Sequence, residues 1–255
     1  MCWSGEASAA IAAVGVLSTG YAAYKKEPRA LWICLGYFSL MEILQAYTYS
    51  VIGQCGNPAN QMATLLGYLH IAFQPFFINA VSMHFIDRRK ARKIAPLVYT
   101  LCFASAVMLL LKLYPFAWAA PCNAIPLCGK ELCSMHGNWH IAWSLPLTTV
   151  GEKAHMYALA AFVAPLLYGS WRFTLYHAVM GPLLAMATTS NMNEWPAVWC
   201  LFSIGFLLVV IKTPLRGLLY VDRGPLWGRR PPQPVVDRHA EADFGNGGNG
   251  NARQS

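Results

Sequence analysis

The alternation of long apolar stretches with short polar loops most constrains how this chain can fold. The apolar stretches cover residues 7–24, 30–52, 62–86, 94–119, 154–170, 173–190 and 195–213. Most of them approach the roughly 20 residues that a helix needs to cross the hydrocarbon of a bilayer. Charged residues make up only 12% of the chain, whereas a soluble domain has about 25%. The pattern therefore predicts an all-α polytopic membrane protein with about seven transmembrane helices.

Basic residues recur in every second loop, and this predicts the orientation of the helices. These loops contain Lys25, Lys26 and Arg29, then Arg88, Arg89, Lys90, Arg92 and Lys93, then Arg172, and finally Arg216, Arg223, Arg229 and Arg230. The alternate loops have few basic residues, namely Lys130 and Lys153. Because cytoplasmic loops carry the excess of lysine and arginine, we expect the N-terminus outside and the C-terminus in the cytoplasm. The expected location is the inner or plasma membrane.

The net charge of +8 raises the question of nucleic-acid binding. The lysine and arginine residues occur in short clusters between apolar stretches and in the tail. Their distribution does not create a continuous basic face. This distribution is typical of loops at a membrane surface. We therefore expect the lipid bilayer as partner, with a small molecule or lipid as a further partner, and no nucleic acid.

The composition divides the chain into two regions. Residues 1–219 form the predicted seven-helix transmembrane domain, with an outer cysteine-rich loop over residues 120–147. Residues 220–255 are rich in proline and then in glycine and asparagine. Such a segment buries too little apolar surface to offset the entropy of ordering. It is expected to be a disordered cytoplasmic tail.

Six of the eight cysteines fall on or near the predicted outer side, where disulfides are permitted in an oxidising compartment. These disulfide candidates are Cys2, Cys55, Cys122, Cys128, Cys133 and Cys200. Six cysteines allow fifteen pairings, so the sequence does not give the connectivity. We expect at least one disulfide with a partner among Cys122, Cys128 and Cys133.

The same loop suggests a metal site as an alternative. Cys128, Cys133, His136 and His140 are close in sequence, and a His-x-x-x-His spacing places two imidazoles one turn apart on a helix. Zinc, copper or iron would be the expected metal. The opposing interpretation is a disulfide-bonded loop with surface histidines, followed by an interfacial helix over residues 138–147.

Glu42 and His70 are the ionisable residues that stand out within the predicted spans. Counted from opposite membrane faces, they lie at similar depths in consecutive antiparallel helices. An isolated charge in hydrocarbon is costly, and such groups are usually paired or functional. We therefore predict a Glu42–His70 contact, in which an imidazolium neutralises the carboxylate or Glu42 stays protonated. Gln45 lies on nearly the same face as Glu42.

Two further polar residues extend this predicted interior. Gln74 precedes Pro75 in the third span, and a proline with polar neighbours often marks a helix that lines a cavity. His177 is expected to join the interior from the sixth span. The alternative role for the side-chain amides of Gln45 and Gln74 is hydrogen bonding between helices, which would contribute about 1 kcal/mol each to helix association.

The start of the chain resembles a known family. Met1, Cys2, Trp3 and Ser4, with Ala7 and Ser8 soon after, are similar to the opening of small multi-span membrane proteins found in bacteria and large DNA viruses. Members also carry an acidic residue with a nearby glutamine in the second span, as Glu42 and Gln45 do here. The family has no established activity. The resemblance implies seven helices and transfers no catalytic residue.

Two classes of function follow from these observations. In the first, the protein binds a small molecule, lipid or ion in a polar intramembrane site and acts as a sensor, carrier or accessory subunit. In the alternative, it is a membrane-embedded metal-dependent enzyme, a hydrolase or oxidoreductase, that uses Glu42 and His70. The sequence favours the first class because it contains no complete catalytic set.

Overall fold

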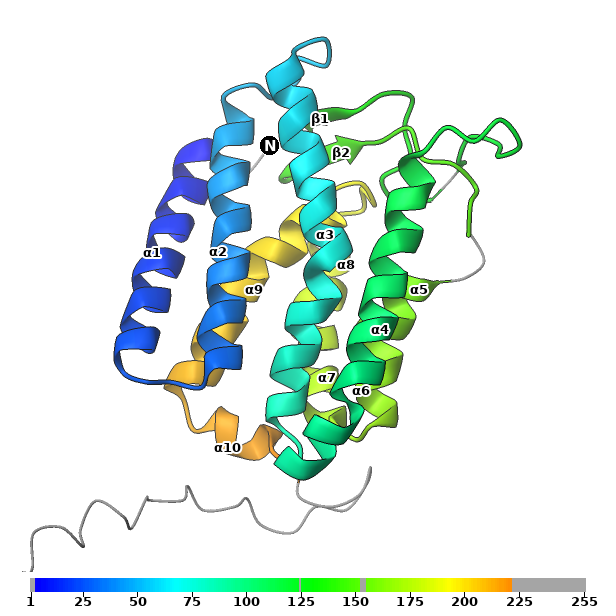
Figure 1. The fold of residues 1–255 in the computed structure, drawn as a ribbon. Helices are drawn as coiled ribbons and strands as arrows, with labels where there is room; N and C mark the ends of the chain where they lie inside the picture. The colour runs from blue at the N-terminus through cyan, green and yellow to red at the C-terminus, as the bar shows by residue number, and fades with distance from the viewer. Residues whose placement is uncertain (1–2, 124, 152–154, 222–255) are drawn as a thin grey trace, which may run out of the picture.

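The computed structural model describes residues 3–123, 125–151 and 155–221, which form a mostly helical bundle (Figure 1). Its five long helices are α1 (Gly5–Tyr24), α2 (Arg29–Tyr49), α3 (Pro58–His84), α4 (Arg88–Leu113) and α9 (Trp195–Lys212). Each of them is long and apolar enough to span a membrane. The first four and the last of the apolar stretches are therefore confirmed as helices.

The other two stretches form shorter helices interrupted by π-helical turns. One consists of α5 (Met156–Ala158), the π-turn η2 (Leu159–Val163) and α6 (Ala164–Leu167), and the next of α7 (Trp171–Ala178), the π-turn η3 (Val179–Leu183) and α8 (Leu184–Thr188). Pro165 and Pro182 lie at or just after these wide turns. A proline has no amide hydrogen to give to the preceding turn, which accounts for the interruptions.

Local sequence signals set the ends of the long helices. The Asp87 side chain accepts hydrogen bonds from the backbone amides of Arg89 and Lys90, so α4 begins before the apolar stretch does. The same helix ends at Leu113, six residues before the predicted end, because Tyr114 precedes Pro115 and adopts an extended backbone.

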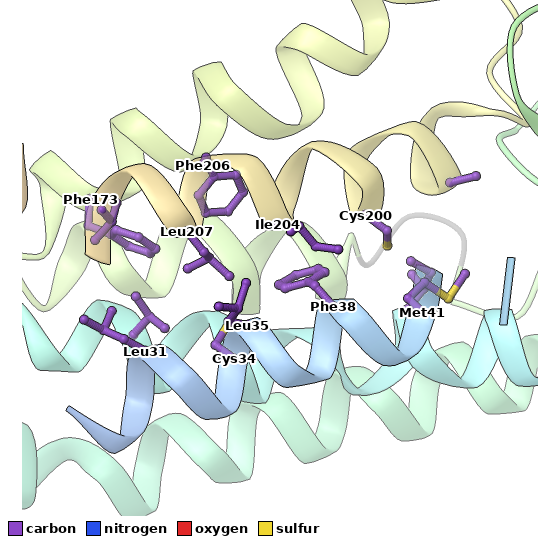
Figure 2. Close-up of a cluster of buried hydrophobic side chains, with 14 of the residues drawn as sticks. Leu31, Cys34, Leu35, Phe38, Met41, Phe173, Cys200, Ile204, Phe206 and Leu207 are labelled. Atoms are coloured by element: carbon purple, nitrogen blue, oxygen red, sulfur yellow. The ribbon is translucent and has the colours of Figure 1, made fainter. Parts of the chain in front are cut away.

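The largest core cluster includes the contact between α2 and α9 (Figure 2). Phe38 and Leu35 of α2 lie against Ile204 and Leu207 of α9, and all four side chains are buried. Of the five long helices, α9 is the most buried and α1 and α4 are the least buried. The bundle is therefore organised around α9.

Helix α1 packs against α2 through small residues. Gly15 lies so close to Ser39 that a β-carbon at this position would overlap the serine side chain. Small residues let helix backbones approach closely, which favours packing where no water is expelled. The buried positions of α1 are all small: Ser8, Ala12, Gly15 and Ala22.

A β-hairpin covers one end of the bundle, which we call the hairpin end (Figure 1). Its strands are β1 (Cys133–His136) and β2 (Ile141–Ser144), paired antiparallel. The Asn60 side chain of α3 donates to the Ser134 carbonyl and accepts from the Ser134 amide, both at 2.9 Å. The interfacial helix expected over residues 138–147 is therefore wrong, because this segment contains a strand that is bonded along its backbone to β1.

Two disulfides hold the hairpin end together. Cys55 in the connection between α2 and α3 is joined to Cys133 of β1, and Cys122 is joined to Cys128. The expectation of at least one disulfide with a partner among Cys122, Cys128 and Cys133 is thus confirmed. Cys200 is not an outer disulfide partner, because it lies more than one turn inside α9 as a buried free thiol. Cys2 lies outside the described residues.

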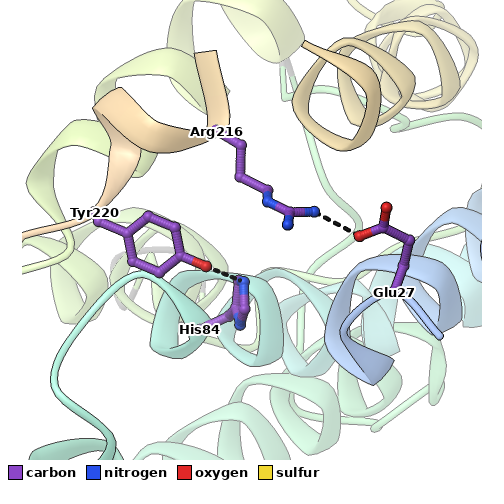
Figure 3. Close-up of polar contacts among 4 residues, drawn as sticks. All are labelled: Glu27, His84, Arg216 and Tyr220. Carbon is purple, nitrogen blue, oxygen red and sulfur yellow. Dashed lines mark hydrogen bonds and ion pairs between the residues drawn. The ribbon is translucent and has the colours of Figure 1, made fainter. Parts of the chain in front are cut away.

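A short helix, α10 (Leu215–Leu219), lies across the opposite end, which we call the α10 end (Figures 1 and 3). Arg216 forms a 2.5 Å ion pair with Glu27, and the Tyr220 hydroxyl is 2.7 Å from Nε2 of His84. Tyr220 thus belongs to the bundle and not to the predicted tail. The rest of that tail, residues 222–255, lies outside the described residues.

Candidate functional site

Glu42 is a buried carboxyl group without a hydrogen-bond partner. It lies on α2 about 10 Å from the hairpin end of that helix, at 1.5 Å per residue. Its side chain is fully buried, and neither carboxyl oxygen has a partner in the structure. A buried polar group is nearly always hydrogen-bonded. Glu42 is therefore the most unusual polar residue of the interior.

The groups around Glu42 come from three helices. Ser8 of α1 lies near the Glu42 carboxyl group without a hydrogen bond to it, and its hydroxyl accepts a 2.9 Å hydrogen bond from the indole of Trp3. Cys200 of α9 interacts electrostatically with Glu42. One turn along α2, Gln45 donates to the Ala197 carbonyl at 3.4 Å, whereas its Oε1 is buried without a partner. These surroundings of Glu42, which we call the Glu42 pocket, thus contain several oxygen atoms.

His140 covers this pocket from the hairpin. Its Nδ1 is 2.6 Å from the hydroxyl of Tyr49, which lies two turns beyond Glu42 on α2. Burial lowers the pKa of His140 to about 3, so its imidazole is neutral. Nε2 of the ring has no hydrogen-bond partner. If the tyrosine donates to Nδ1, the neutral ring carries its proton on Nε2 and has an unused donor.

Glu194, which precedes α9, fixes the position of His140. Its carboxylate accepts hydrogen bonds from the backbone amides of Asn138, Trp139 and His140, the last two at 2.9 and 3.0 Å. Gly137 packs directly against this carboxylate, and a β-carbon there would overlap it. Three backbone amides thus converge on this one side chain and hold the turn of the hairpin against the start of α9. The sequence did not lead us to predict this role of Glu194.

Trp3 closes the site from the N-terminal side. Its backbone amide donates to the Trp139 carbonyl at 3.1 Å, and its ring stacks on the ring of Trp139 with centroids 5.4 Å apart. Together with its bond to Ser8, these contacts connect the start of the chain to the hairpin. Trp3 and Ser8, two of the residues that carry the sequence resemblance, therefore lie close to Glu42.

The predicted contact between Glu42 and His70 is wrong. Nε2 of His70 has no hydrogen-bond partner, and neither does either oxygen of Glu42. The His70 ring instead stacks on Tyr37, with centroids 3.8 Å apart. Tyr37 lies five residues before Glu42, which is roughly 140° around the helix. Glu42 and His70 lie at similar depths, but the Glu42 side chain leaves one side of α2 and His70 of α3 packs against another side of α2.

His70 lines a shallow apolar hollow on the surface of the bundle instead. The hollow has a volume of about 630 Å³ and is lined by Tyr37, Leu66, Leu69, His70, Phe73, Phe76 and Phe77. Apart from the histidine and the tyrosine, its lining is aliphatic and aromatic. It is separate from the pocket around Glu42.

Gln74 and His177 do not join the Glu42 pocket. The Oε1 atom of Gln74 accepts a 2.8 Å hydrogen bond from Tyr157. His177 is buried among aromatic rings, with Phe162 stacked at 5.1 Å, and neither ring nitrogen has a partner. Of the five predicted residues, Glu42 and Gln45 lie together, and His70, Gln74 and His177 lie elsewhere.

The predicted metal site is also corrected. Cys128 and Cys133 belong to different disulfides, so neither provides a thiolate ligand. His136 ends β1 and is exposed, whereas His140 is buried beyond the turn. They are therefore not one turn apart on a helix. Within the part of the chain that the structure describes, no three histidine, cysteine, aspartate or glutamate side chains form a group that could hold a metal.

The fold and this site define a class of protein: a helical bundle with five helices long and apolar enough to span a membrane, and a disulfide-bonded hairpin above a buried carboxyl group. The chain belongs to the family of unknown function DUF5765, whose model matches residues 6–220. The predicted membership of an uncharacterised family is consistent with this match. The matched region includes Glu42, His140 and Glu194 but begins after the opening motif. No curated protein and no solved structure matches the chain.

Proposed function

We propose that the protein is an integral membrane protein with seven spans, the hairpin end outside and the α10 end in the cytoplasm. Large apolar side chains on its surface support this proposal: Leu17, Leu97 and Leu167 are 74, 74 and 79% exposed. Extended exposed apolar surface is rare on soluble monomers. The basic segments that begin at Lys25 and Arg88 both lie at the α10 end, as expected for a cytoplasmic face.

We further propose that the pocket around Glu42 binds one small monovalent cation, either a proton or an alkali-metal or ammonium ion. The observation that carries this proposal is that both Glu42 oxygens and Gln45 Oε1 are buried without a partner. Oxygen atoms are the ligands that such hard cations prefer. One monovalent cation would neutralise the single carboxylate, which makes an intramembrane charge tolerable. A carrier, sensor or accessory subunit would use such a site.

The test combines infrared spectroscopy with calorimetry on the protein in lipid nanodiscs. Wild type is expected to show the band of a protonated carboxylic acid that is missing in Glu42→Gln. Adding sodium, potassium or ammonium chloride, with choline chloride as the reference salt, distinguishes the two kinds of ion. Loss of the band with measurable heat indicates exchange of the proton for that ion. A band that persists in every salt indicates a proton site.

The exposed Glu131 in the hairpin-end loop provides the matched control, because Glu131→Gln removes a carboxylate without touching the pocket. This variant should retain the band and the heats of wild type. The cation proposal would be overturned if wild type and Glu42→Gln gave identical spectra and neither bound a cation. The alternative of a metal-dependent enzyme depended on Glu42 with His70, and these residues do not meet.

The membrane topology has its own test. Single cysteines replacing Lys130 at the hairpin end and Lys90 at the α10 end would be treated with a membrane-impermeant thiol reagent on intact cells, in a background lacking Cys2. Lys130→Cys should be labelled from outside and Lys90→Cys only after the cells are opened. The reverse pattern would contradict the proposed orientation.

A further inference from the structure

A second cavity lies on the other side of α9 from Glu42. It has a volume of about 540 Å³ and lies between α3, α4, α5, α8 and α9, beneath the loop that contains Leu127. Trp199 lines this cavity, whereas the next residue, Cys200, does not line it and interacts electrostatically with Glu42. The two sites thus share a helix but no lining residue. Pockets for small ligands typically have volumes of about 300–1,000 Å³.

Most of the walls of this cavity present apolar groups. They include Ile71, Phe162 and Pro182 together with aromatic rings. The tyrosine hydroxyls are already used: Tyr68 donates to the Leu109 carbonyl at 2.7 Å, and Tyr157 donates to Gln74 at 2.8 Å. These two rings therefore offer their faces and not their hydroxyls. These walls match a hydrocarbon chain.

The rim of the cavity at the hairpin end has a different character. Lys112, one residue before the end of α4, and His155, which precedes α5, both line the cavity. These are the basic side chains among its lining residues, and they lie at the same end. The cavity thus combines a basic rim with an apolar interior, which matches a molecule with an anionic head and a hydrocarbon tail.

We infer that this cavity binds a single-chain lipid whose anionic head, a carboxylate or a phosphate, lies at Lys112 and His155 and whose acyl chain extends toward Phe162. Binding of this lipid goes beyond the proposed cation site and is independent of it, because it requires neither Glu42 nor His140. In the proposed orientation, the head would lie at the outer face of the membrane.

The test measures binding of oleate and of oleyl alcohol to the full chain in phosphatidylcholine nanodiscs by native mass spectrometry. We expect one oleate per protein and at least tenfold weaker binding of the alcohol, which has the same tail without the charge. An oleyl phosphate arm distinguishes a phosphate head from a carboxylate head. Lys112→Gln should lower oleate affinity about tenfold and leave binding of the alcohol unchanged.

Met186→Trp places a larger side chain in the cavity from α8 and should abolish binding of oleate. The matched control is Leu183→Trp, because Leu183 is exposed on the same helical segment and does not line the cavity. If Met186→Trp does not fold, Ala158→Phe fills the cavity from α5 instead. The inference is overturned if oleate does not saturate at one per protein, if both cavity-filling variants still bind it, or if the alcohol binds equally well.

Discussion

The hydroxyl of Tyr49 lies 2.6 Å from Nδ1 of His140, and this contact joins the second helix to the hairpin two turns beyond Glu42. The two residues are 91 positions apart in the sequence. Nε2 of His140 and both carboxyl oxygens of Glu42 are buried without a hydrogen-bond partner.

Acid should destabilise the protein partly through His140. Its pKa is lowered to about 3 by burial, whereas the unfolded value is about 6.5. Below that value the unfolded chain takes up a proton that the folded chain does not, so stability falls as the pH decreases from about 6.5 toward 3. This residue alone should account for about 2 kcal/mol between neutral pH and about pH 5.

Thermal unfolding in detergent at both pH values checks this prediction. His140→Asn keeps an acceptor for the Tyr49 hydroxyl and should lose less stability on acidification than wild type. The control is His136→Asn, since His136 is exposed in the same hairpin. Equal acid sensitivity of His140→Asn and wild type would contradict the burial of a neutral imidazole.

Glu42→Gln should raise the stability of the protein while it abolishes cation binding. The change keeps the shape of the side chain and removes an ionisable group whose oxygens have no partner. A gain of about 1 kcal/mol is expected, as is common where a residue is retained for function at a cost in stability. The midpoint of thermal unfolding measures the effect, and Glu131→Gln should leave it unchanged. A clear loss of stability would mean that Glu42 is a structural residue.

Glu194→Ala should release the hairpin from the start of α9. The change removes the acceptor for three backbone amides, two of them at 2.9 and 3.0 Å. Hydrogen bonds to a charged group contribute about 1.5–3 kcal/mol each, so a loss of roughly 3 kcal/mol or more is expected. Hydrogen exchange of the amides at 138–140 provides the measurement. Glu194→Gln keeps one acceptor oxygen and should lose less, and protection of these amides in both variants would contradict the role.

The two disulfides should differ in their contribution to stability. Cys55 and Cys133 are 78 residues apart, whereas Cys122 and Cys128 are six residues apart. In the chain-entropy model a longer loop restricts the unfolded chain more, and the difference here is about 2 kcal/mol. The Cys55→Ser/Cys133→Ser variant should therefore unfold at a lower temperature than Cys122→Ser/Cys128→Ser. The opposite order would show that strain or residual structure outweighs loop entropy.

The apolar pattern predicted the helices well because long uninterrupted runs of apolar residues have few alternatives. The ends depended on single residues that the pattern did not weigh. Asp87 as a cap and Pro115 after Tyr114 shifted α4 by six residues relative to the apolar stretch. The prolines at 165 and 182 produced π-turns that periodicity alone does not indicate.

The site was predicted only in part because depth along a helix does not specify direction around it. Glu42 and Gln45 were correctly grouped, since residues three apart share a face. His70 was assigned to them by depth, although its contact with Tyr37 places it on another side of α2. The hairpin was missed, but Gly137–Asn138 between two short runs is a recognisable turn signal. Glu194 is an acidic residue directly before an apolar helix. This position was the available sequence signal that its side chain is buried and holds the hairpin.

The attachments of the hairpin also determine how anything can reach Glu42. The Cys55–Cys133 disulfide, the Glu194 carboxylate and the stacked Trp3 hold it at three separate places. A hairpin attached at three places cannot move away from the bundle as one rigid body. An ion would instead have to pass between helices, and α1 is among the least buried of the long ones and contacts α2 through small residues. Slight separation of the part of α1 beyond the Trp3 contact would provide a side entrance that leaves the hairpin in place.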